Sequence, residues 1–161
     1  MRKYHIIIAA LVVALDQFTK WLVAQRISLH DSVDVIPGLF RLTHVQNQGA
    51  AFGLFSESPS EWKVAMLILF SVAALAVVSA LLWKNGNAMN ATAIALSLVF
   101  GGALGNLWDR VANGRVIDFL DFYVGSHHWP AFNVADSAIV VGALLLIKIF
   151  LAPQTEKAIS Q

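Results

Sequence analysis

The sequence contains no cysteine, and this absence excludes several kinds of chemistry at once. Without cysteine the chain has no disulfide, no thiolate zinc site and no cysteine nucleophile. Charged residues are also scarce, at 13% of 161 residues, and the formal net charge of +1 gives no basic surface for nucleic acid. Any chemistry must therefore come from carboxylates, histidines, hydroxyl groups or lysine.

Two common motifs of serine-dependent and metal-dependent hydrolases are missing as well. The sequence has no Gly-x-Ser-x-Gly and no His-Glu-x-x-His motif. Its five histidines show no metal-ligand spacing with a carboxylate on a helix, and we interpret His127-His128 as a polar pair in a loop. The sequence therefore predicts no metal and no cofactor.

Long apolar runs dominate the rest of the chain. Hydrophobic residues make up 58% of the sequence, and its mean hydropathy is +0.68. A soluble domain of this size cannot hide so much apolar surface from water. A membrane-spanning helix needs about 20 mostly apolar residues, and four segments qualify: residues 6–24, 64–83, 91–108 and 131–151. We expect an all-α membrane protein in which residues 1–161 form a single integral membrane domain with four transmembrane helices.

The first apolar run allows two interpretations. Arg2 and Lys3 ahead of it are typical of a secretory signal, but no small-residue cleavage motif follows, so we expect a retained span. Counting flanking positive charges does not decide the orientation, because five lie on one side and six on the other. Arg2 and Lys3 favour a cytoplasmic N-terminus, and four spans then place both termini in the cytoplasm.

Two long connections, residues 25–63 and 110–130, lie on the outer side in this orientation. Residues 39–45 and 116–124 within them are rich in β-branched and aromatic residues, which favour strands. We therefore expect a small β-element in the periplasmic loops, next to the four-helix bundle.

Polar residues of three spans are expected at this same outer end. A charge within the hydrocarbon costs at least about 2.5 kcal/mol, so such residues suggest a function unless they pair with each other. The residues in or next to the outer ends of the spans are Asp16, Lys20, Asn106, Asp109, Arg110, Asp118, Asp121, Asn133 and Asp136.

Four of these residues also have a structural interpretation. Asp16 and Lys20 are four residues apart and can pair on one helix face. Asp109 and Arg110 can anchor a helix at the membrane interface.

Asp136 is harder to explain as structure alone, because no cation lies one turn away on its own helix. Asn133 and Asp136 have the spacing of an N-cap and an acid in the first turn, so Asp136 can merely cap the helix. The same geometry favours an ionised carboxylate, which suits a general base.

Gly101 and Gly105 form a GxxxG spacing. This spacing is typical of transmembrane helices that pack closely. Close packing here would bring the third span near the carboxylates.

Five sequence blocks, in this order, resemble lipoprotein signal peptidase (signal peptidase II) over essentially the whole chain. They are residues 16–20 (DQFTK), 47–53 (NQGAAFG), 101–110 (GGALGNLWDR), 116–119 (VIDF) and 132–136 (FNVAD). The resemblance implies an aspartic endopeptidase, a hydrolase of the bacterial inner membrane with its active site at the periplasmic face. Its implied partners are membrane lipid and a prolipoprotein, which is cut just before a diacylglyceryl-modified cysteine to release the signal peptide.

The resemblance also assigns site residues. The catalytic pair of the family matches Asp118 and Asp136. Residues that line the site and hold the substrate match Asn47, Asn106, Arg110 and Asn133, and residues that support it match Asp16 and Lys20. Asp118 and Asp121 are three apart and point to opposite faces of an extended strand, so only one can meet Asp136. The resemblance selects Asp118, and we expect Asp121 to be solvated on the other face.

An acidic pair of this kind can share one proton, activate water and protonate a leaving amine. The alternative function is a small membrane transporter or proton-relay subunit, since intramembrane acids also serve that purpose. A scaffold subunit without chemistry is a further alternative. A transporter is expected to hold its acids near the middle of the bilayer, whereas these acids gather at one end.

Overall fold

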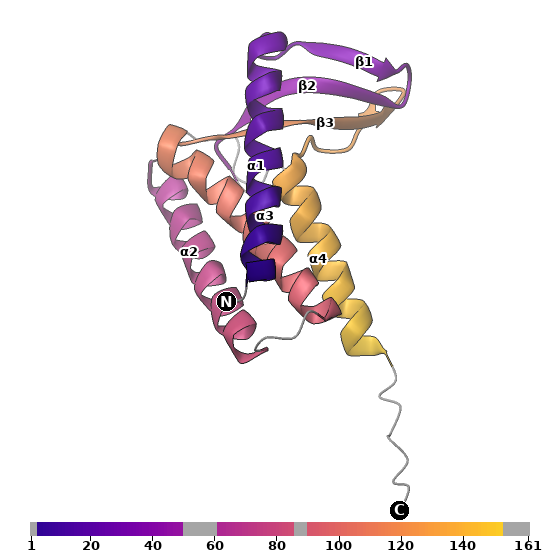
Figure 1. Cartoon of the computed structure of the whole chain (residues 1–161). Helices are drawn as coiled ribbons and strands as arrows, with labels where there is room; N and C mark the ends of the chain where they lie inside the picture. The colour runs from indigo at the N-terminus through magenta and orange to yellow at the C-terminus, as the bar shows by residue number, and fades with distance from the viewer. Residues whose placement is uncertain (1–2, 50–60, 86–89, 153–161) are drawn as a thin grey trace, which may run out of the picture.

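The computed structural model describes residues 3–49, 61–85 and 90–152. Within them the helices are α1 (Lys3–Arg26), α2 (Glu61–Lys84), α3 (Ala91–Asn113) and α4 (Val134–Leu151). The strands are β1 (Ser32–Ile36), β2 (Phe40–Asn47), β3 (Val116–Val124) and β4 (His127–His128). All four helices are long and apolar enough to cross a membrane. The sheet lies at one end of the bundle, and α1 begins and α4 ends at the opposite end (Figure 1).

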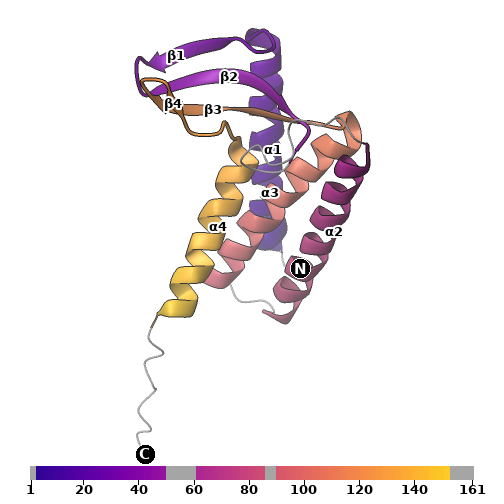
Figure 2. The same ribbon diagram turned by 180° about the vertical axis from the view of Figure 1, so that it is seen from behind.

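Helix α3 is the central helix of the bundle and packs against the other three (Figures 1 and 2). A Cβ atom at Gly101 would lie 2.9 Å from the carbonyl oxygen of Ala9 in α1, and one at Gly105 would lie 2.8 Å from Oδ2 of Asp16. The close packing predicted from the GxxxG spacing is therefore confirmed. Gly102, on another face of α3, is in still tighter contact with α4.

The strands form an antiparallel sheet in the order β1-β2-β3-β4. Its buried side packs against the end of α1, where Val23, Ile27 and Phe119 form an apolar cluster. The pairing of β2 with β3 shifts by one residue between Leu42 and Val45, which is a β-bulge in β2.

Each of the four predicted spans corresponds to one helix, and the β-element is found as β2 and β3. The boundaries differ from the prediction by a few residues, and two of these differences have a clear structural cause. Helix α3 continues to Asn113, where Gly114 ends it in the left-handed region with φ 67°. Helix α4 begins only at Val134, because Asn133 caps it. Residues 86–89 ahead of α3 and residues 50–60 of the first outer connection lie outside the described residues.

Candidate active site

All eight predicted site residues come together at the sheet end of the bundle. They are Asp16 and Lys20 of α1, Asn47 of β2, Asn106 and Arg110 of α3, Asp118 of β3, Asn133 at the start of α4, and Asp136 in its first turn. Five of the structural elements therefore meet at one place, as the sequence predicted.

Asp118 is buried in β3 and is 3% exposed. Its Oδ1 accepts a hydrogen bond from Nδ2 of Asn133 at 2.7 Å, and its Oδ2 accepts one from Nδ2 of Asn47 at 2.9 Å. Burial raises the pKa of Asp118 to about 6; the hydrogen bonds from Asn47 and Asn133 oppose this rise, and the negative charge of Asp136 adds to it.

Asp136 lies in the first turn of α4 beside the same asparagine. Oδ1 of Asn133 accepts the backbone N–H of Asp136 at 2.9 Å, which confirms the predicted N-cap. The Asp136 carboxylate itself accepts a hydrogen bond from Nδ2 of Asn106 at 2.8 Å. The amide of Asn133 thus connects the segments that carry the two acids.

Lys20 is buried at the centre of an ion cluster. Its Nζ contacts Oδ2 of Asp16 at 2.7 Å, Oδ2 of Asp109 at 2.6 Å and Oδ1 of Asn106 at 3.0 Å. Asp109 is 5% exposed, so its interpretation as an interfacial anchor is wrong. Because Lys20 holds the oxygen of Asn106, the amide nitrogen of Asn106 is directed to Asp136.

The contacts of Asp16 go beyond the helix-face pair with Lys20. Its Oδ1 accepts the backbone N–H of Ala135 at 2.9 Å, which joins α1 to the first turn of α4. Gln17, which was not singled out from the sequence, donates to Oδ1 of Asp109 at 3.0 Å and to Oδ2 of Asp16 at 3.2 Å. Its position between Asp16 and Lys20 in the 16–20 block was the feature of the sequence that could have identified it as a site residue.

Arg110 connects α3 to the end of β2. Its Nη2 donates to the carbonyl oxygen of Gly49 at 3.1 Å, and its Nη1 donates to that of Asn106 at 3.2 Å. Its Nε is buried and has no hydrogen-bond partner among the described residues.

Asp121 was expected to be solvated, and this expectation is wrong. It lies on the opposite face of β3 from Asp118, as predicted, but it is 4% exposed. Its Oδ2 pairs with Nε of Arg41 at 2.6 Å, and its Oδ1 lies 3.0 Å from Nδ1 of His128. His127 and His128 form the short strand β4 rather than a loop. The spacing of acids along a strand indicates the face but not the residues that cover it.

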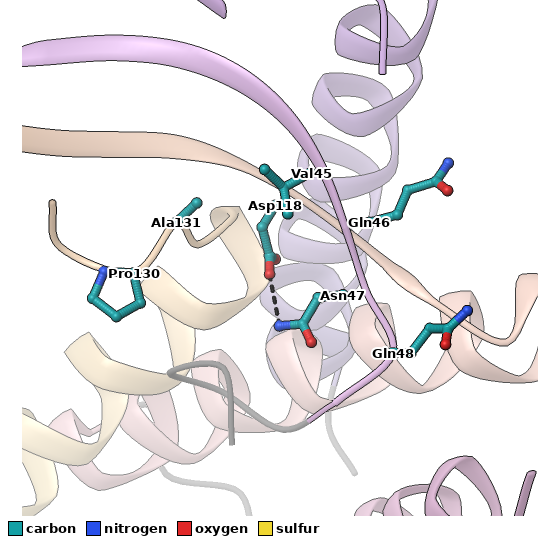
Figure 3. Close-up of a pocket in the computed structure, with 7 residues that line it drawn as sticks. All are labelled: Val45, Gln46, Asn47, Gln48, Asp118, Pro130 and Ala131. Carbon is teal, nitrogen blue, oxygen red and sulfur yellow. Dashed lines mark hydrogen bonds between the residues drawn. The ribbon is translucent and has the colours of Figure 1, made fainter. Parts of the chain in front are cut away.

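Two cavities border Asp118. One, of about 210 Å³, lies between β2 and the segment before α4, and Figure 3 shows Asn47 and Asp118 directed toward each other at its edge. The other, of about 510 Å³, is bordered by both Asp118 and Asp136. Its remaining lining is mostly apolar and consists of Trp129, Pro130, Ala131, Phe132, Ser137, Ile139, Val140 and Val141. Within the described parts of the chain, no cluster of three or more acids and histidines could hold a metal ion.

Comparison with known proteins decides the family. The family model described as signal peptidase (SPase) II matches residues 8–152. The chain belongs to this family. It is therefore a peptidase of the aspartic type.

Curated relatives and a solved structure are similar to the chain over nearly its whole length. The lipoprotein signal peptidase of Solibacter usitatus is 47% identical over 151 residues, covering 94% of this chain and 92% of the relative. That of Syntrophus aciditrophicus is 44% identical, covering 95% of each chain. A bacterial membrane enzyme structure obtained by the in meso method at 2.3 Å resolution superposes with TM-score 0.85 and 34% identity, covering 98% of this chain and 93% of that one.

Proposed function

We propose that Asp118 and Asp136 are the catalytic dyad with which this member of the signal peptidase II family removes signal peptides from prolipoproteins. One observation carries the proposal. Two acids from separate elements border a single apolar cavity, and each accepts a hydrogen bond from a site asparagine. A buried acid pair at a cavity is the arrangement that aspartic peptidases require.

The proposed reaction needs one proton shared between the two acids. The ionised acid, which we assign to Asp136, takes a proton from water as the water oxygen attacks the scissile carbonyl carbon. The protonated acid, assigned to Asp118, donates its hydrogen to the carbonyl oxygen and polarises it. The C–N bond then breaks, and the leaving amine takes a proton from the dyad. The pKa of Asp118, raised to about 6, supports its role as the acid that carries the proton.

The proposed substrate is a prolipoprotein whose cysteine after the cleavage site carries a diacylglyceryl group. The larger cavity suits such a substrate, because apolar side chains of α4 line it next to both acids. Arg110 and the site asparagines supply the N–H donors that would hold the peptide backbone. No metal takes part in the proposed mechanism.

We also propose the placement of the chain in the bacterial inner membrane, as one integral membrane domain. Both termini would be cytoplasmic and the site would face the periplasm. Two observations support this: Arg2 and Lys3 precede the first apolar run, and the sheet lies opposite the beginning of α1 and the end of α4 (Figure 1). The acids at one end of the helices fit a peptidase acting near the interface better than a transporter or proton relay.

The decisive test is cleavage of a lipidated precursor peptide by purified protein in detergent. Asp118→Asn and Asp136→Asn keep side-chain volume but remove the charge and the proton, so each should lower kcat by about 10²- to 10⁴-fold. The double variant should be little worse than either single variant, because the two acids act as a unit. Chelators should leave activity unchanged.

Two controls make this test specific. Asp34, an exposed carboxylate on β1, and Asp121, the buried acid on the other face of β3, should both tolerate replacement by asparagine far better. Full activity of a folded Asp118→Asn or Asp136→Asn protein would refute the dyad, and inhibition by a chelator would indicate a metal-dependent reaction.

A further inference from the structure

The bulge in β2 decides which of its side chains face the dyad. Before the bulge, Phe40 lies opposite Phe122 and Leu42 lies opposite Leu120. After it, Val45 lies opposite Asp118. One extra residue in β2 therefore separates the two parts, and an extra residue reverses the alternation of side chains along a strand.

This reversal puts Asn47 on the same side of the sheet as Asp118. Asn47 lies opposite Val116, two residues from Asp118 on β3, and its Nδ2 donates to Oδ2 of Asp118 at 2.9 Å. With an unbroken register, His44 would lie opposite Asp118, and Asn47 would point to the other face of the sheet. The hydrogen bond from Asn47 to Asp118 thus depends on the bulge.

The two bulged residues, Thr43 and His44, are held by the connection between α1 and β1. Nδ1 of His44 donates to the carbonyl oxygen of Ile27 at 2.9 Å, since a carbonyl can only accept. Oγ1 of Thr43 donates to the carbonyl oxygen of Asp31 at 3.1 Å. The backbone of His44 makes two further hydrogen bonds: its carbonyl oxygen accepts from the N–H of His30, and its N–H donates to the carbonyl oxygen of Asp31.

Burying the side chain of His44 has an energetic cost, because one of its two ring nitrogens is left without a partner in the part of the chain that the structure describes. The residue is 6% exposed, and its Nε2 is buried without a hydrogen-bond partner among the described residues. An unpartnered buried nitrogen is unfavourable, so an apolar side chain of similar size would be the more stable occupant. What histidine supplies here is the Nδ1 donor that ties the bulge to the end of α1.

We propose that His44 is a positioning residue for the dyad: it fixes the bulge of β2, and the bulge directs Asn47 to Asp118. His44 touches neither acid in the described contacts and acts through Asn47. The inference rests on the proposed function, because it requires Asp118 to be a catalytic acid.

Two replacements of His44 separate positioning from folding. In asparagine the Nδ2 donor is as many bonds from the backbone as Nδ1 in histidine, so His44→Asn should keep the bond to Ile27 and most of the activity. Leucine fills similar space without a donor, so His44→Leu should remain folded but lose activity. We expect kcat on a lipidated precursor peptide to fall about tenfold or more, with KM little changed, as for loss of a hydrogen bond to a charged group.

A double-mutant cycle with Asn47→Ala tests the route of the effect. If His44 acts through Asn47, adding His44→Leu to Asn47→Ala should cause no further loss of kcat. Equal losses in the two backgrounds, or equal activity of His44→Asn and His44→Leu, would overturn the proposal. If His44→Leu does not accumulate, Thr43→Val, which removes the second tie to the bulge, should give the same non-additive loss, and additive loss overturns the proposal. Asp118→Asn in the same assay separates these outcomes, because only failure of the proposed function leaves that variant active.

Discussion

The three asparagines of the site each present an amide whose orientation is determined by its partners. In each, the oxygen accepts from a group that can only donate: a backbone N–H for Asn47 and Asn133, and the ammonium of Lys20 for Asn106. The amide nitrogen is then the only end left to face Asp118 or Asp136. The site therefore holds both acids with N–H donors whose direction is fixed by the other partners of each asparagine.

Asp118 also makes the stability of the protein depend on pH. Its pKa is about 6 in the folded chain against an ordinary value of 3.8, so the folded state binds more protons between these pH values. Stability contributed by this proton is present below pH 3.8 and is lost as the pH rises through 6. Asp118→Asn removes this loss, so the variant should gain stability relative to the wild type as pH rises.

The gain should reach up to about 3 kcal/mol at neutral pH, reduced by any mismatch between the new amide and its two asparagine neighbours. Thermal unfolding in detergent, followed by tryptophan fluorescence between pH 4.5 and 7.5, measures it. Asp34→Asn serves as the exposed control. A stability difference that stays constant over this range would show that Asp118 does not titrate within it.

Individual residues were predictable where a motif gave their identity, and less so where only spacing was available. The eight site residues converge as expected, because helix ends and strand faces follow from the order of the spans. The predicted environments of Asp109 and Asp121 were wrong, because their partners Lys20 and Arg41 lie on other elements and cannot be inferred from spacing along one element. The bulge that turns Asn47 toward Asp118 has no signal in the alternation of β2.

At the scale of elements, Gly102 allows α3 and α4 to approach each other. A Cβ atom at this position would overlap the carbonyl oxygen of Ala135, next to Asp136. Gly102→Ala must therefore move α4 away from α3, which weakens the contact between Asn106, one turn further along, and Asp136. We expect kcat to fall by up to about 10²-fold, the cost of misplacing a catalytic group by about 1 Å.

The matched control is Leu104→Ala on the same helix. Leu104 is 36% exposed, so its truncation should leave the dyad geometry and the kcat unchanged. Wild-type kcat in Gly102→Ala would show that the bundle absorbs the extra methyl group without moving the acids.

Helices were the most predictable elements, because an apolar segment that crosses a membrane must satisfy its own backbone hydrogen bonds, and a helix does so. The end of α3 was placed too early because Asp109 and Arg110 looked like interfacial charges. Strand β1 was not predicted, since it is only five residues long and largely exposed. A short edge strand has only a weak alternation of apolar and polar residues. Strand β1 forms because it pairs with β2, and its own sequence does not indicate this pairing.

The orientation of the whole molecule can be tested directly, because the chain has no cysteine of its own. Ser126 lies exposed in the turn between β3 and β4, and Ser160 lies outside the described residues. A cysteine at Ser126 should react with an impermeant thiol reagent added from the periplasmic side, whereas one at Ser160 should react only after permeabilisation. The reverse pattern would place the site in the cytoplasm.

The ion pair between Asp16 and Lys20 has a consequence for how the protein is made. It lies within α1, whereas Asp109 and Ala135, the other partners of these residues, belong to α3 and α4. A ribosome delivers α1 to the membrane before either partner exists. A pair four residues apart lets α1 neutralise its own charges at that moment, which lowers the cost of inserting them. Because Asp136 arrives with the last helix, a partly synthesised chain lacks one acid of the proposed dyad, and we expect it to be inactive toward its neighbours during biogenesis.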